Sequence, residues 1–204
     1  MVPGFEEPTL AYEQAMGGAE RVKPRATPAG AFERAREYLR AGKRIDMVAL
    51  SADLGVARGT LYRWTGDRDQ LISDVLWAES KQTLDQLLAH TDPGDMPTCQ
   101  VIGAGFIEVV AGSSAVRAFL RNEGQRALLL LTVPTSTYRT RLMQALIELI
   151  ERDAERGYKP PESPELLADS IISLGERFLH NGGEPDANPS PEMAHRAIAL
   201  LLRE

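Results

Sequence analysis

The sequence is poor in the residues that build disulfides and metal centres. Among 204 residues there is one cysteine, Cys99. A single thiol excludes a disulfide within the chain and a cysteine-rich zinc site, and it is typical of a reducing compartment. The three histidines, at positions 90, 180 and 195, lack the spacing of metal ligands. We therefore expect neither a metal nor a cofactor.

Long hydrophobic runs are also missing. Even the longest runs, among them residues 127–131, are far shorter than the about 20 residues that cross a membrane. Residues 1–28 contain four prolines and no apolar signal core, so we expect them to form a flexible arm. These features predict a cytoplasmic protein.

Familiar catalytic motifs are absent from the sequence. No GxxxxGK[ST], HExxH or GxSxG pattern occurs. Gly103 and Gly105 begin a string like GxGxxG, but Glu108 takes the place of the last glycine, and no strand is predicted before it. We expect a protein that is not an enzyme, although acidic residues brought together by folding would escape this search.

Charge is distributed unevenly along the chain. Residues 21–70 carry 11 Lys and Arg against 6 Asp and Glu, whereas residues 71–204 carry 12 against 19, and residues 1–20 carry four acids and no base. A basic block on an acidic body indicates a polyanionic partner at one end. Charge statistics alone leave chance clustering as an equal alternative.

Apolar residues recur with helical spacing nearly throughout, and no alternating strand pattern is present. We predict an all-α fold of nine or ten helices, divided by glycines, prolines and short polar clusters. The expected helices span residues 29–40, 46–54, 57–64, 69–90, 98–111, 114–121, 123–131, 138–156 and 164–180, with a last one from 191.

The stretch from Asp46 to Trp64 has the spacing of a helix-turn-helix, with Gly55 at the turn. Four apolar residues can form a small core between its helices, namely Leu50, Leu54, Val56 and Leu61. The second helix then exposes polar and basic residues, which suits a helix lying in the major groove of DNA.

This stretch resembles the TetR family of bacterial transcriptional regulators. The match covers LSADLGVARGTLYRW, residues 50–64, and continues to Arg68 and Leu71 without a gap. Three positions depart from the family pattern: Ala57 replaces a Ser or Thr cap, Thr65 replaces an aromatic residue, and Arg68 replaces Lys. A missing cap costs about 1 kcal/mol of helix stability, and the departures leave the exposed polar and basic residues of the second helix in place.

After the arm at 1–28, the resemblance implies a DNA-binding domain at 29–75 and a ligand-binding and dimerisation domain at 76–204. A helical hairpin without a nucleic-acid role is the alternative for the second segment. Arg21, Lys23 and Arg25 could enter a minor groove, but a solubilising tail is the favoured reading. The predicted DNA-binding residues are Arg44, Asp46, Ala57, Arg58, Gly59, Thr60, Tyr62, Arg63, Trp64 and Arg68.

Two helices of the C-terminal part, 138–156 and 164–180, are apolar on more than one face. Together with the resemblance, this favours a homodimer in which the two helices of each subunit form a four-helix interface. The alternative is that both faces pack inside one chain. The predicted interface residues are Leu142, Leu149, Ile150, Leu167, Ile171, Leu174 and Phe178.

A ligand pocket in a regulator of this type is apolar, with a few polar groups. We expect its lining among Phe106, Val110, Phe119, Asn122, Arg126, Leu130, Met143, Leu146, Ser173, Glu176, Arg177 and His180, although each could serve only the core or an ion pair. Residues 117–132, 175–179 and 183–186 resemble the QsdR-like regulators of lactone quorum-sensing signal catabolism, which implies a small apolar acyl or lactone ligand.

The whole sequence thus predicts a homodimeric repressor that leaves a palindromic operator when a small apolar ligand binds. The alternative is an all-α small-molecule carrier that does not read a DNA sequence.

Overall fold

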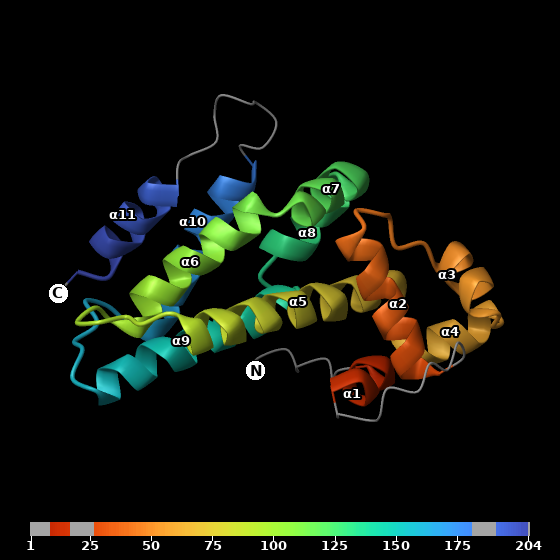
Figure 1. The fold of residues 1–204 in the computed structure, drawn as a ribbon, viewed down its shortest axis with the longest axis horizontal. Helices are drawn as coiled ribbons and strands as arrows, with labels where there is room; N and C mark the ends of the chain where they lie inside the picture. Colours follow the sequence, from red (N-terminus) through yellow and green to blue (C-terminus); the bar gives the residue numbers. More distant parts are fainter. Residues whose placement is uncertain (1–8, 17–26, 181–190, 204) are drawn as a thin grey trace. The chain divides into compact units, whose positions relative to one another are not determined.

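The computed structural model describes residues 9–16, 27–180 and 191–203, and within these residues every regular element is a helix (Figure 1). The predicted all-α fold is confirmed. The helices are α1 Leu10–Met16, α2 Pro28–Arg40, α3 Met47–Leu54, α4 Arg58–Thr65, α5 Arg68–His90, α6 Thr98–Gly112, α7 Ser114–Glu123, α8 Gln125–Thr132, α9 Thr137–Glu155, α10 Pro164–His180 and α11 Pro191–Leu201.

The breaks between the first helices fall at the glycines that the sequence marks. Gly42, Gly55 and Gly66 have φ of 65°, 68° and 67°, a conformation that side chains with a Cβ rarely adopt. Thr27 caps α2 through a bond from the Gly30 N–H to its hydroxyl, at 3.1 Å. The helices α2 to α11 follow the expected ranges closely because local caps and breakers set their ends.

Helix α1 lies in the segment that we expected to be a flexible arm. It packs on α2 and α4, with Ala11 buried and the Tyr12 ring set edge-on to Phe32 at 5.6 Å between centroids. The Thr9 hydroxyl donates to the Asp74 carboxylate at 2.6 Å. Such a short helix is unstable alone and forms because these partners cover it, which the local sequence cannot reveal.

The chain divides into two compact units. One comprises Met1–Glu79 and Ser114–Tyr138, and the other comprises Ser80–Ser113 and Arg139–Glu204. The first unit is therefore larger than the DNA-binding domain expected at 29–75, because α7 and α8 pack with the N-terminal helices. The basic residues Arg21, Lys23 and Arg25 lie outside the described residues.

The first unit is organised around a core shared by α2, α3, α4 and the first half of α5. Its largest fully buried side chains are Phe32, Leu50, Leu61, Leu71, Ile72 and Val75. Burying each such side chain stabilises a fold by about 1.5–3 kcal/mol. Within this core, α2 packs against α3 and α4, and α3 packs against α4.

The second unit packs α6 against α10 and α11. Its fully buried side chains include Ile102, Leu146, Ile150, Leu167, Ile198 and Leu202. Pro97 precedes α6 and offers no side-chain acceptor, so the Asp153 carboxylate of α9 accepts the Cys99 N–H at 2.6 Å. The Cys99 thiol is itself buried, and burial raises its pKa to about 12.

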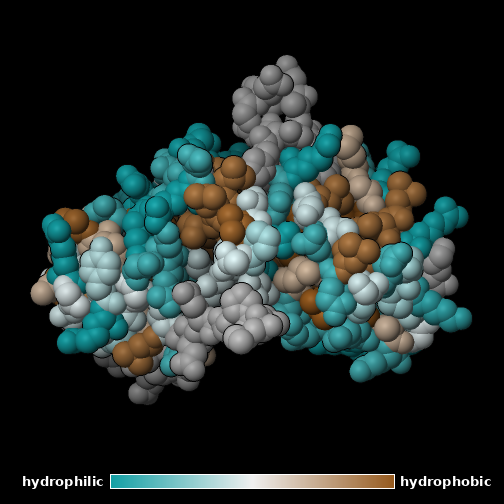
Figure 2. All heavy atoms as spheres, turned by 180° about the vertical axis from the view of Figure 1, so that it is seen from behind, coloured by the Kyte–Doolittle hydropathy of each residue, from teal (hydrophilic) through white to brown (hydrophobic). Residues whose placement is uncertain are grey.

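No single helix in the described segments has the length and apolar composition of a membrane span. Helices α6 and α7 have that length and composition only when they are counted together across the bend between them. Apolar side chains do reach the surface in several places, as the brown atoms among the teal ones show in Figure 2. Those that are most exposed include Met96, Leu129, Leu166, Met193 and Leu200.

Candidate nucleic-acid interface

Helix α3 opens at a strong cap. The Asp46 carboxylate accepts the N–H groups of Val48 at 3.0 Å and Ala49 at 2.9 Å. These bonds, first the one from Ala49, favour the charged form and lower the pKa of Asp46. Asp46 was predicted to bind DNA, and in this structure its side chain serves the helix end.

The turn between α3 and α4 is compact. Gly55 adopts the left-handed conformation, with φ 68° and ψ 31°, and the Val56 N–H returns to the Ser51 carbonyl at 3.0 Å. Ala57 then precedes α4 and makes no side-chain capping bond. The chain therefore reverses over three residues, as a helix-turn-helix requires.

The inner side of the helix-turn-helix is apolar. Leu50 and Leu61 are fully buried, Leu54 is nearly so, and Val56 is half-buried. The Thr65 hydroxyl donates to the Leu61 carbonyl at 3.0 Å, which accommodates a polar residue where an aromatic one is usual. The predicted small core is present, and it orients α4 with one side outward.

That outward side consists of Arg58, Gly59, Tyr62 and Arg63, which are all exposed and which we call the reading face. Thr60 and Trp64 flank it and are half-exposed, and Ala57 is exposed at its start. Tyr62 keeps 46% of its surface accessible. The predicted α4 residues thus lie together on an open surface.

The positive charge on the reading face is not offset by ion pairs with other described residues. Across the described part of the chain, neither Arg58 nor Arg63 has an ion pair with an acidic side chain. Elsewhere on the same unit, Arg34 pairs with Asp53 and Glu37, and Arg36 and Arg40 pair with Glu79. Two cations on one helix face, free of carboxylates, are suited to phosphates and to base edges.

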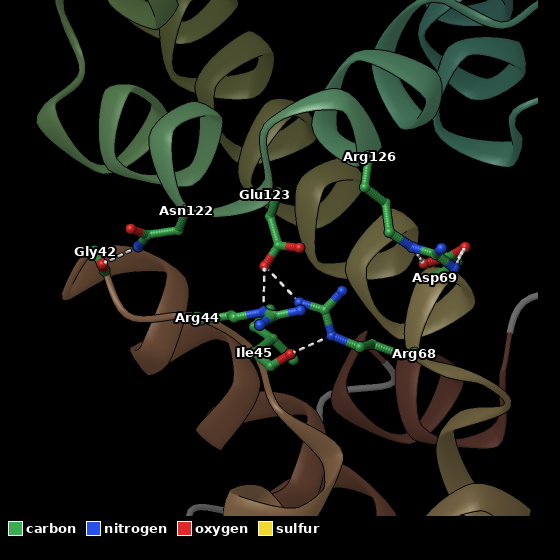
Figure 3. Close-up of polar contacts among 8 residues, drawn as sticks. All are labelled: Gly42, Arg44, Ile45, Arg68, Asp69, Asn122, Glu123 and Arg126. Carbon is green, nitrogen blue, oxygen red and sulfur yellow. Dashed lines mark hydrogen bonds and ion pairs between the residues drawn. The ribbon is translucent and has the colours of Figure 1, made fainter.

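Arg44 and Arg68, also predicted to bind DNA, lie elsewhere (Figure 3). They face residues 122–126, the junction of α7 and α8, which we call the elbow. The Arg68 Nε donates to the Ile45 carbonyl at 2.5 Å, and its guanidinium pairs with Glu123. Arg44 lies 3.6 Å from the same carboxylate, and its side chain is 62% exposed against 18% for Arg68. Only Arg44 is therefore open to a further partner.

The predicted ligand-binding residues fall into both units. In the first, Phe119 and Leu130 are buried, whereas Asn122 and Arg126 are exposed and bound to Gly42 and Asp69. In the second, Phe106 and Leu146 are buried, Val110, Met143 and Glu176 are half-buried, and Ser173 and Arg177 are exposed. The side chain of His180 lies outside the described residues.

The predicted dimer residues are largely covered within one chain. Leu142, Leu149, Ile150, Leu167 and Ile171 are buried, Leu174 is half-buried, and the side chain of Phe178 lies outside the description. The first five form the core of the second unit, which agrees with the alternative that both faces pack inside the chain. Side chains of α10 and α11 that remain open are Leu166, Met193 and Leu200, at 51%, 56% and 71% exposure.

Two charged residues that sequence reasoning did not select occupy buried positions. Glu123 closes α7, and Arg139 of α9 pairs with Asp169 at 2.8 Å and faces Glu176 at 3.5 Å. Their partners are at least 30 residues away in the sequence. No local motif marks such long-range pairs, so only the folded structure identifies them.

Comparisons with known proteins concern the family and the fold. Residues 98–203 match the family model described as Tetracyclin repressor-like, C-terminal domain. The R. erythropolis transcriptional repressor QsdR, from the TetR family, is similar in structure, with a TM-score of 0.72, 27% identity, and coverage of 84% of this chain and 92% of that one.

A second solved structure shares the fold alone. It is the fatty acid degradation regulator FadR from Bacillus halodurans, with a TM-score of 0.51 and 13% identity over 82% of this chain and 95% of that chain. No curated protein matches the sequence. Since the family model covers more than half of the residues, this chain belongs to the TetR family.

Proposed function

We propose that the protein is a cytoplasmic, homodimeric transcriptional repressor that binds a palindromic operator and is released by a small ligand. The observation that carries the proposal is the reading face. Arg58 and Arg63 are exposed there, and no carboxylate among the described residues pairs with them, on the second helix of a helix-turn-helix. Membership of the TetR family supports it.

Each residue of the reading face has a chemical role in this proposal. Arg58, near the start of α4, donates two hydrogen bonds to a guanine in the major groove, and Thr60 contacts a thymine methyl. Gly59 permits a close approach, since nothing lies within 4 Å of where its Cβ would be. Tyr62, Arg63 and Trp64 contact phosphates and fix the position of the helix.

A second copy of the chain supplies the second reading face. Two-fold symmetry of the protein then matches the symmetry of a palindromic operator. Support comes from Met193 and Leu200, which are exposed seven residues apart on α11, and from Leu166 on α10. Two turns of a helix separate residues seven apart, so Met193 and Leu200 share a face.

For the ligand we propose an apolar acyl or lactone-like molecule. The support is the resemblance to QsdR-like regulators and the 27% identity to the QsdR structure. In the second unit, buried Phe106 and Leu146 and half-buried Met143 supply apolar surface, and Glu176 and Ser173 supply polar groups.

The test begins with selection of duplexes from a random library by the full-length protein, followed by fluorescence anisotropy at several salt concentrations. A repressor binds the selected duplex far more tightly than a scrambled one, and both affinities fall as salt rises. Binding that is salt-sensitive but blind to sequence favours the carrier instead. Acyl lactones and fatty acyl compounds are then titrated, and no effect on operator affinity contradicts the proposed ligand class.

A further inference from the structure

Within the first unit, the elbow is bonded to residues on both sides of the helix-turn-helix. Before α3, the Asn122 side-chain amide donates to the Gly42 carbonyl at 2.9 Å. After α4, the Arg126 Nε donates to the Asp69 carboxylate at 2.6 Å, in a two-point pair. Glu123 lies between these two attachments, as Figure 3 shows.

Glu123 is the most enclosed residue of the three. Its side chain is only 3% exposed, and one carboxylate oxygen faces both Arg68 and Arg44. A carboxylate removed from water to this degree needs a paired cation, and losing that partner is strongly unfavourable. The positions of Glu123 and Arg68 are therefore linked.

Arg68 connects the two ends of the helix-turn-helix. It is the first residue of α5, close after Thr65 at the end of α4, and its Nε binds the carbonyl of Ile45, directly before the cap of α3. One guanidinium thus fixes the entry and the exit of the motif and joins both to Glu123.

The elbow also belongs to the part of the sequence that matches the C-terminal domain, residues 98–203, although it packs with the N-terminal helices. The packing is close, since a Cβ on Gly42 would lie 2.9 Å from the Cβ of Ala118 on α7. A segment of the ligand-binding domain therefore touches the frame that holds the reading face.

We propose that Glu123 is a positioning residue that couples the elbow to the reading face through Arg68. The proposal rests on the proposed function and specifies how that function is regulated. Coupling between two sites is reciprocal, so a duplex on the reading face must change the local stability of the elbow. This consequence can be measured before any ligand is known.

The experiment measures amide hydrogen exchange in the full-length protein, with and without a saturating amount of the selected duplex. In the wild-type protein, the duplex should slow exchange at residues 119–128 by about fivefold or more, the lower end of usual coupling factors. In Glu123→Gln, which keeps the shape and removes the charge, this slowing should be lost although the duplex is saturating.

Glu37→Gln is the matched control. It makes the same chemical change on the same unit, at a side chain that is 59% exposed and paired with Arg34. Its elbow should respond to the duplex as in the wild type. Should Glu123→Gln lose its circular dichroism spectrum, Asn122→Ala replaces it, and at least half of the slowing should disappear.

Three results would overturn the proposal. The first is that amides of the wild-type elbow exchange equally fast with and without duplex. The second is that the duplex slows exchange fully in folded Glu123→Gln, and the third is that it does so in Asn122→Ala where that variant is the one tested. A library that yields no specific duplex instead removes the proposed function, and the coupling proposal with it. The two failures are therefore distinguished at the selection step.

Discussion

The reading face and the contacts of the elbow both involve several arginines, yet the two places differ in what surrounds these cations. Arg58 and Arg63 are exposed and have no acidic partner in the part of the chain that the structure describes, whereas Arg68 is enclosed and bound to Glu123. All three come from the basic block at residues 21–70. Local positive charge thus produces an open surface in one place and an internal brace in another.

The difference lies in the placement of carboxylates. Glu79 pairs with Arg36 and Arg40, and Glu123 with Arg68, each from a distant helix. A paired guanidinium has its donors occupied and gains little from a phosphate, while an unpaired one keeps its donors available. Charge counts along a sequence therefore locate a nucleic-acid surface only roughly, and pairing in the fold refines the location.

The largest effect should come from Arg68→Ala. We expect the free energy of unfolding to fall by about 3 kcal/mol, because Glu123, 3% exposed, would lose the cation that it touches. Urea denaturation measures the change. Arg63→Ala on the reading face is the comparison, and it should stay within about 0.5 kcal/mol of the wild type. Equal stability of the two variants would erase the contrast between the surfaces.

The second effect concerns DNA rather than stability. Arg58→Ala should weaken binding to the selected duplex by about 1–3 kcal/mol and relax the preference at one base pair, if Arg58 reads guanine. Anisotropy with single-base variants of the duplex measures both. Arg34→Ala removes the same charge at a side chain paired with Asp53 and Glu37, and it should change affinity much less. Uniform weakening over all duplexes would make Arg58 a backbone contact.

The smallest effect concerns Asp46, the N-cap of α3. Asp46→Ala should cost about 1 kcal/mol at pH 7, since the N–H groups of Val48 and Ala49 lose their acceptor. Their bonds hold the pKa of Asp46 in the folded state below its unfolded value of about 3.9.

The contribution of Asp46 is therefore present above the unfolded pKa and disappears as the pH falls through the folded pKa. Denaturation of both proteins over falling pH should show their stability difference shrinking under acid conditions. A difference that stays constant over the pH range would mean that the carboxylate charge has no part in the cap.

Helix positions and the reading face were predictable from the sequence because local rules determine them. Glycine breaks at 42, 55 and 66 set the helix ends, and 3.6-residue spacing set which side of α4 is buried. Neither rule depends on distant residues. The TetR family pattern of residues 50–64 added the function to this framework.

The rest of the site depends on tertiary partners. Helix α1 forms because Tyr12 packs against Phe32 and Thr9 donates a hydrogen bond to Asp74. The local sequence pattern does not predict these partners. Asn122 was predicted to contact ligand, and in the structure its amide binds Gly42, 80 residues away. The apolar faces of helices can likewise be buried within one chain or between two chains, and helical periodicity does not distinguish these cases.

The enclosed thiol at Cys99 has a practical consequence for spectroscopy. With 0% exposure and a pKa of about 12, it contributes almost no thiolate at neutral pH, and maleimide reagents need one. A cysteine introduced at exposed Lys81 or Gln144 would then be the residue that the dye labels, and Cys99 would not need to be replaced. Both positions belong to the second unit, so the surroundings of the dye in that unit can be followed by fluorescence in a nearly native chain.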